Sequence, residues 1–336
     1  MIKVILAAAC LVLSAAALQA GGLDDLKAAN AAVEKGSGDE AIRLFTQALA
    51  TNDLSPADQA AARKGRGGEY TVKSIIADAF ERSDEARRLR VDAVADLTVA
   101  LGLKADDDSI IVARGQIYHL NRQYDLAIAD FDAALKLNNS TLTLMQRAAS
   151  HRAKRDYDRA VADYTAALGL DSKDSGLEGW EIYNERGYAQ FLAARYDAAA
   201  ADFEKALTIG SASHSGDVLW LPYQASWLHI ARARAGQNDA EELARHAGKI
   251  DLKQWPGTLV AFFLGQTTLD KLSPPSNHGA MGRGRECNLS FFTAEQALIK
   301  NDRAEASRLL LRAHEVCNVH TFISLAATVE LERLGK

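Results

Sequence analysis

Proline is scarce in this chain, which has 5 prolines among 336 residues. The chain is 48% hydrophobic and rich in Ala, Leu, Asp and Arg. This composition is typical of a soluble all-helical protein. We therefore do not expect a disordered chain.

An excess of positive charge is missing as well. The formal net charge at pH 7 is −5, whereas phosphate binding draws on a concentrated basic surface. One candidate for such a surface, from Arg283 to Arg285 in a glycine-rich loop, contains only two arginines. We therefore expect no nucleic acid among the partners.

Long hydrophobic runs are absent beyond the N-terminus. Residues 1–20 carry one cation at Lys3, an apolar run from Val4 to Leu13 and small residues ending at Ala20. This is the pattern of a signal peptide cleaved after Ala20, with an uncleaved N-terminal anchor as the alternative. No later segment reaches the roughly 20 apolar residues that a membrane span needs. We expect a periplasmic or secreted protein whose mature net charge is −6, because Lys3 is removed.

Catalytic motifs are missing too. The sequence contains no His-Glu-x-x-His, no phosphate-binding glycine loop after a strand and no nucleophile elbow. Acidic residues stand beside Arg and Lys, as on a solvated helix face. We expect no enzyme activity, no cofactor and no metal. The rival interpretation is a hydrolase that uses Cys287 or a histidine, which requires a base near the nucleophile.

One short phrase recurs along the middle of the chain. It consists of Ala, a small or aliphatic residue, Ala, Asp and a large apolar residue, and it begins at residues 93, 127, 160 and 199. The recurrence every 33 to 39 residues predicts a stack of helical hairpins. In each unit the phrase is the second helix, helix B. Small residues, such as Gly115 and Gly187, mark where the first helix, helix A, crosses its partner closely.

The units differ in regularity along the chain. Residues 107–210 hold three regular repeats, and residues 21–106 hold irregular ones, of which the second has about 18 extra residues that form either an overlong helix or an additional one. Residues 211–336 read as degenerate hairpins followed by a closing helix from Val319 to Leu334. Such a terminal helix hides the last hydrophobic face of a repeat array.

The repeated phrase, the helix A segment from Asn184 to Gly187 and the closing segment together resemble tetratricopeptide-repeat proteins of bacterial cell envelopes, NlpI-like in general plan. The resemblance implies an all-α superhelix of helical hairpins (an α-solenoid) with a C-terminal capping helix. It also implies an adaptor that docks envelope proteins, including hydrolases and proteases. The lipid-attachment cysteine of a lipoprotein is missing from this sequence.

Helix A supplies the inner wall of such a superhelix, so residues on it are candidates for a peptide groove. They do not form the Lys and Asn pattern that clamps a terminal carboxylate, and we expect mixed polar and apolar contacts instead. The alternative for each is packing against the next repeat. The candidates are Gln116, His119, Met145, Arg152, Asn184, Tyr188 and Phe191.

Two cysteines remain after removal of the signal segment. Cys287 opens a helix and Cys317 follows its antiparallel partner, so both lie at the same end of one hairpin, which permits a disulfide. A zinc site that adds His314 and His320 is the alternative, and two free buried thiols are another.

All four tryptophans lie between residues 180 and 255, at Trp180, Trp220, Trp227 and Trp255. Tryptophan fills gaps between irregular repeats and also dominates binding hot spots, and we favour the core role. An apolar cavity around Trp220 and Trp255 would instead favour the alternative function, a small-molecule or glycan-binding protein.

Overall fold

The computed structural model describes residues 21–80, 82–170, 179–213, 220–272, 280–318 and 321–336. Over these residues the chain forms seventeen α-helices, so the prediction of an all-α repeat fold is confirmed. The chain divides into two compact units, residues 1–117 and residues 118–336, which are described separately. None of the helices in the described ranges is long and apolar enough to cross a membrane.

Unit 1 contains two antiparallel hairpins and the start of a third. The helices are α1 (Gly22–Glu34), α2 (Gly38–Ala50), α3 (Pro56–Ala79), α4 (Ser83–Leu103) and α5 (Asp108–Leu120), whose last turn belongs to unit 2. The extra residues of the second repeat lengthen α3 to 24 residues and α4 to 21. Of the two alternatives that the sequence allows here, the overlong helix forms over the described residues and the additional one does not. Ser55 starts α3 by accepting a hydrogen bond from the backbone N–H of Asp58.

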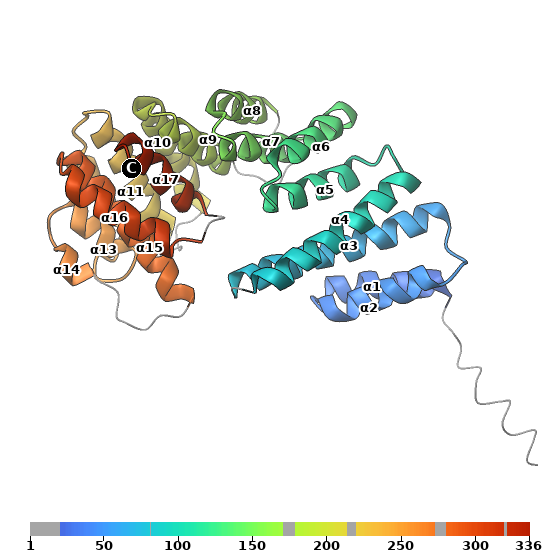
Figure 1. Ribbon diagram of the computed structural model, residues 1–336. Helices are drawn as coiled ribbons and strands as arrows, with labels where there is room; N and C mark the ends of the chain where they lie inside the picture. Colours follow the sequence, from blue (N-terminus) through green and yellow to red (C-terminus); the bar gives the residue numbers. More distant parts are fainter. Residues whose placement is uncertain (1–20, 81, 171–178, 214–219, 273–279, 319–320) are drawn as a thin grey trace, which may run out of the picture. The chain divides into compact units, whose positions relative to one another are not determined.

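Unit 2 continues the same hairpin pattern from the green to the red end of the chain (Figure 1). Its regular helices are α6 (Tyr124–Leu137), α7 (Thr141–Ala153), α8 (Tyr157–Gly169), α9 (Trp180–Leu192) and α10 (Tyr196–Ser213). The degenerate part has α11 (Trp220–Arg234), α12 (Ala240–Ala247), α13 (Gly257–Phe263), α14 (Leu269–Leu272), α15 (Ala280–Ile299), α16 (Arg303–Val316) and α17 (Phe322–Arg333). Most of the insertion predicted between the last two regular repeats lies outside the described residues.

The recurring phrase lies on helix B in four hairpins, on α4, α6, α8 and α10. Its first alanine is fully buried in every copy, and so is the large apolar residue that ends it. Small side chains permit close approach of neighbouring helices, and the large ones fill the remaining space. At Gly187 on α9, an added Cβ would lie 2.7 Å from the ring of Phe203 on helix B. The close crossing predicted at Gly187 is therefore present.

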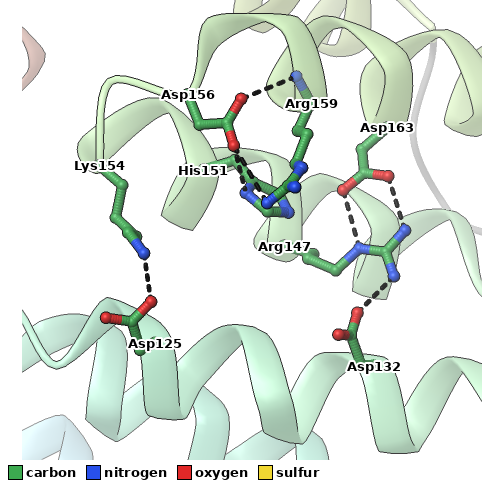
Figure 2. A network of polar contacts seen from close by, with 8 residues as sticks. All are labelled: Asp125, Asp132, Arg147, His151, Lys154, Asp156, Arg159 and Asp163. Atoms are coloured by element: carbon green, nitrogen blue, oxygen red, sulfur yellow. Dashed lines mark hydrogen bonds and ion pairs between the residues drawn. The ribbon is translucent and has the colours of Figure 1, made fainter.

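The aspartate of the phrase holds an arginine from helix A. Arg147 on α7 donates two hydrogen bonds to Asp163, at 2.8 and 2.6 Å, and a third, at 2.6 Å, to Asp132 on the preceding helix B (Figure 2). Arg186 forms the same pair with Asp202 and reaches back to Thr165. In unit 1, Arg66 binds Asp96 and Thr46 in the same way. Each of these arginines therefore links its own hairpin to the one before it.

Six of the turns that join a helix A to its helix B share one backbone geometry. In each of these turns the second residue after the end of helix A has a positive φ. Its backbone N–H donates a hydrogen bond to the carbonyl three residues earlier. Glycine adopts this left-handed conformation without strain, whereas other residues pay roughly 1–2 kcal/mol. In order along the chain the positions are Gly36, Arg122, Arg155, Ala194, Gly236 and Asn301.

The C-terminal hairpin contains the predicted disulfide. Cys287 and Cys317 are bonded, with their Cα atoms 4.9 Å apart. The bond uses both sulfurs, so neither is available for the alternative zinc site, and His320 lies outside the described residues. No group of three or more metal-binding side chains occurs within the described ranges.

The closing helix α17 packs on α15 and α16 as a cap, and side chains at its end also contact the regular repeats of unit 2. Arg333 donates a hydrogen bond to the backbone carbonyl of Leu192 on α9. Glu332 pairs with Arg155, in the turn that follows α7. The C-terminal helix thus lies along the side chains of helix A, where the sequence predicted an open groove.

Candidate partner-binding site

The predicted groove residues of unit 2 line one of two pockets or pack in the core, and Gln116 belongs to unit 1. His119 and Arg152 line one pocket, and Asn184 and Tyr188 line a second. Met145 is half-buried and packs against the core around Tyr164. Gln116 lies half-buried on the part of α5 that belongs to unit 1.

Phe191 does not lie in a groove. Its side chain is 0% exposed and makes ring contacts with Tyr196 and Trp227. The structure thus corrects the sequence interpretation at this position. The physical reason is that α9 packs against α10, and the ring of Phe191 also meets Trp227 on α11, so this side chain forms part of the core.

The first pocket, which we call the basic pocket, has a volume of about 360 Å³. It is bounded by the ends of α5 and α7, the turns that follow them, the side of α17, and His314 at the end of α16. Five of its lining residues are Arg or His, and none is Asp or Glu. These five are His119, Arg122, Arg152, Arg155 and His314. A concave site with cationic walls and no lining carboxylate attracts negative charge.

Arg152 is the most buried arginine of the basic pocket. Its side chain is 13% exposed and forms an ion pair of 2.7 Å with Glu185. Burial by itself lowers the pKa of Arg152, but the carboxylate of Glu185 outweighs it and holds the pKa above its ordinary value. The guanidinium also lies 5.2 Å from the ring centroid of Phe322, a cation–π contact. Its Nη1 atom is buried without a hydrogen-bond partner.

The second pocket, which we call the aromatic pocket, has a volume of about 430 Å³. Its walls come from α9, α11, α15 and the first turn of α17. No lining residue is charged. Six are aromatic and three are amides, and the full set is Trp180, Asn184, Tyr188, Trp220, Tyr223, Gln224, Trp227, Asn288, Phe322 and Ile323.

Two amide oxygens in the aromatic pocket have no hydrogen-bond partner. Gln224 is 4% exposed and Asn184 is 8% exposed, and the side-chain carbonyl oxygen of each is unpaired. Leaving a buried acceptor unpaired costs about 1–3 kcal/mol. Burial raises the pKa of Tyr188 further above neutral pH, so its hydroxyl carries no charge. The aromatic pocket therefore presents neutral apolar walls with unused acceptors.

Phe322 separates the two pockets and lines both. Its ring stacks on Tyr188 with centroids 4.2 Å apart, and it meets Trp227 at 5.4 Å. Three of the four tryptophans also line the aromatic pocket, while Trp255 does not. Trp227 is 3% exposed and lies within the core cluster of this unit, as the core interpretation predicts.

Sequence reasoning missed Phe322, Gln224 and Arg122. Phe322 and Gln224 lie outside the regular repeats. The sequence there has no regular spacing from which residues of the inner wall could be predicted. Arg122 did carry a signal, because it occupies the turn position that is glycine in Gly36 and Gly236. A large cation at a left-handed position carries backbone strain that glycine would avoid, which makes Arg122 a candidate for a role beyond the turn.

The hairpin order, the shared turns and the repeated arginine–aspartate pairs define a helical-hairpin repeat protein. Comparison with known families agrees. Tetratricopeptide-repeat sequence profiles match residues 26–68 and 145–214, and a second profile of the same repeat matches residues 109–141. The chain is a tetratricopeptide-repeat protein.

One solved structure shows the same fold, and a second is similar over part of the chain. A tetratricopeptide repeat protein from Parabacteroides merdae ATCC 43184 is 13% identical, covers 94% of this chain and 99% of its own, and has a TM-score of 0.53. MamA from Desulfovibrio magneticus RS-1 is 15% identical over 58% of this chain and 97% of its own, with a TM-score of 0.46. Proteins of this repeat class generally serve as scaffolds for protein–protein interaction.

Proposed function

We propose that this protein is an exported adaptor of the bacterial cell envelope that binds a segment of another protein at the basic and aromatic pockets. One observation carries the proposal: side chains from the helix A positions of three successive hairpins converge with α17 on two adjacent pockets. His119, Arg152 and Tyr188 come from α5, α7 and α9. Scaffolding needs surface complementarity alone, and it requires no nucleophile and no cofactor.

Export is supported by two features. The signal pattern of residues 1–20 ends before α1, which begins at Gly22, so cleavage after Ala20 removes no part of a described helix. The disulfide between Cys287 and Cys317 is of the kind that persists in oxidising compartments. The resemblance to NlpI-like proteins supports envelope partners.

Mass spectrometry of the unreduced protein from its native host tests export. We expect a mass that begins at Gly21 and lacks two hydrogens relative to the free dithiol. A mass that includes residues 1–20 would reject cleavage, and fractionation with the cytoplasm would reject export.

Partner binding is tested by in-cell crosslinking and co-purification from the envelope. The variant Arg122→Glu combined with Asn288→Lys reverses one charge in the basic pocket and places a charge in the uncharged aromatic pocket. Lys136→Glu combined with Gln254→Lys makes the same charge changes at exposed positions outside both pockets.

We expect a set of envelope proteins that co-purifies with wild type and with the control, and that the pocket variant loses. Circular dichroism melts of both variants should match wild type. Equal recovery of the same proteins by all three chains would reject the pockets as the binding site.

A further inference from the structure

We infer that the bound segment is acidic and aromatic: it places a carboxylate in the basic pocket and a neighbouring aromatic side chain in the aromatic pocket. This inference rests on the proposed function and names the chemistry of its partner. The two pockets impose different requirements, and each is argued from its own walls.

The basic pocket selects a carboxylate. Its walls hold five Arg or His side chains and no acid, although the whole chain carries a net negative charge. Two of the cations, Arg152 and Arg155, are partly neutralised by Glu185 and Glu332. Arg122 is exposed and pairs with no carboxylate among the residues that the structure describes. It is therefore the cation most open to an incoming acid.

Backbone strain gives independent support for Arg122. Its φ is +60°, in the left-handed region where glycine is free of strain and where glycine, asparagine and alanine stand at equivalent turns of this chain. Arg155, with a φ of +67°, occupies the equivalent position one hairpin later and lines the same pocket. Two arginines at strained positions, both facing one pocket, indicate selection for positive charge at that place.

The aromatic pocket selects a neutral ring that carries a donor. It lacks charged residues, so burying an ionised side chain there would be costly. The unpaired oxygens of Gln224 and Asn184 need N–H or O–H groups, because a carbonyl oxygen can only accept. An indole, a phenol or the peptide N–H groups beside such a residue would satisfy them, and the ring would pack on the six aromatic walls.

One short peptide can occupy both pockets, because the two are adjacent and share Phe322 as a lining residue. A neutral sugar would suit the aromatic walls and the amides, but it would leave the basic pocket without a counter-charge. A peptide that carries an acid beside an aromatic residue fills both. Charge complementarity therefore favours the peptide.

Selection from a phage-displayed random dodecapeptide library on the full mature chain tests the inference. Enriched sequences are then synthesised with a fluorescent label, and their affinities are measured by anisotropy at two salt concentrations. We expect the enriched sequences to place Asp or Glu within a few residues of Trp, Tyr or Phe.

Variants separate the two pockets. Arg122→Glu should weaken binding about tenfold and reduce its salt dependence, since it removes a charge attraction. Gln224→Leu should weaken binding about tenfold with unchanged salt dependence, since a lost hydrogen bond to a buried acceptor has this magnitude. Gln224→Leu should also raise the melting temperature, because it removes an unpaired buried oxygen. A purely structural glutamine would not show both effects.

Matched controls lie outside both pockets. Lys136→Glu reverses an exposed charge, and Gln296→Leu removes another buried amide oxygen that has no hydrogen-bond partner. Both should bind the enriched peptides within twofold of wild type. Equal losses in the controls would overturn the assignment of the two pockets.

Other outcomes also overturn the inference. Enriched peptides without an acid or without an aromatic residue would do so, and so would the absence of any enriched peptide. Binding of chitotriose that Gln224→Leu abolishes, without peptide binding, would assign the aromatic pocket to a sugar. In each case envelope proteins that still crosslink to the pockets would leave the proposed adaptor function standing, whereas their absence would reject that function as well.

Discussion

The guanidinium of Arg147 donates two hydrogen bonds, of 2.8 and 2.6 Å, to the carboxylate of Asp163 (Figure 2). Such two-point pairing is among the stronger polar contacts in proteins. The third bond of Arg147, to Asp132, joins the hairpin of α7 and α8 to the preceding helix B. The pair therefore fixes the crossing of two helices and the stacking of two repeats at once.

Replacing Arg147 by Met should destabilise the protein by about 3 kcal/mol, because it leaves Asp163 without its counter-ion at a side chain 11% exposed. Urea unfolding measures the loss. The control is Arg159→Met, whose side chain is 73% exposed and should change stability by no more than about 0.5 kcal/mol. The double variant Arg147→Met with Asp163→Leu should recover part of the loss. Equal effects of Arg147→Met and the control would show that the pair contributes nothing to folding.

The scaffold was largely predictable from the sequence, because alanine and aromatic spacing on helix B reports packing between helices adjacent in the chain. The partner of Asp163 was also within reach. Arg147 and Arg186 both precede the small residue of helix A and stand sixteen positions before their aspartates. This arginine-to-aspartate spacing recurs as regularly as the repeated phrase itself. It relates residues on two different helices, however, so a search for patterns within single helices does not find it.

The candidate site was predictable only in part. His119, Arg152 and Tyr188 follow from the rule that helix A forms the inner wall. Phe322 does not, since its contacts with Tyr188 and Arg152 join segments more than 130 residues apart. The repeats between these residues are irregular, so they have no regular spacing from which the contact could be predicted. The open groove expected from repeats alone is consequently narrowed to two pockets by the chain's own last helix.

The disulfide should stabilise the C-terminal hairpin and the start of α17 beyond it. Its loop spans 30 residues, for which closure of the unfolded chain is worth roughly 3 kcal/mol. Cys317→Ser should lower the free energy of unfolding by about that amount, measured by urea titration. Dithiothreitol should have the same effect on wild type and none on the variant. A wild type insensitive to reductant would contradict a stabilising bond.

A buried carboxylate pair should make stability depend on pH. Glu295 and Glu330 both contact Arg234, at 2.6 and 3.2 Å, and Arg333 also pairs with Glu330. Burial, reinforced by the charge of Glu330, raises the pKa of Glu295 from 4.5 to about 8. The folded state therefore binds this proton more tightly than the unfolded state does. The stabilisation is complete below about pH 4.5 and is lost as the pH rises through about 8.

Glu295→Gln imitates the protonated form, so its free energy of unfolding should fall less than that of wild type between pH 5 and 8.5. Urea titrations at several pH values measure both slopes. Glu315→Gln is the control, because its side chain is 65% exposed and pairs with the surface residue Arg312, and its slope should equal that of wild type. Parallel curves for all three proteins would mean that Glu295 releases its proton equally in the folded and unfolded chain.

Arg122→Gly should make the protein more stable and a poorer binder. Glycine relieves the left-handed strain at this turn, worth about 1 kcal/mol, and it removes the exposed cation of the basic pocket. Ala194→Gly is the matched control, since Ala194 has a φ of +57° at the equivalent turn of the next hairpin but one and lines neither pocket. Both variants should gain stability in urea titrations, and only Arg122→Gly should lose affinity for the peptides selected on wild type. If the two behaved alike in binding, Arg122 would be an ordinary turn residue and its strain would have no connection with a partner.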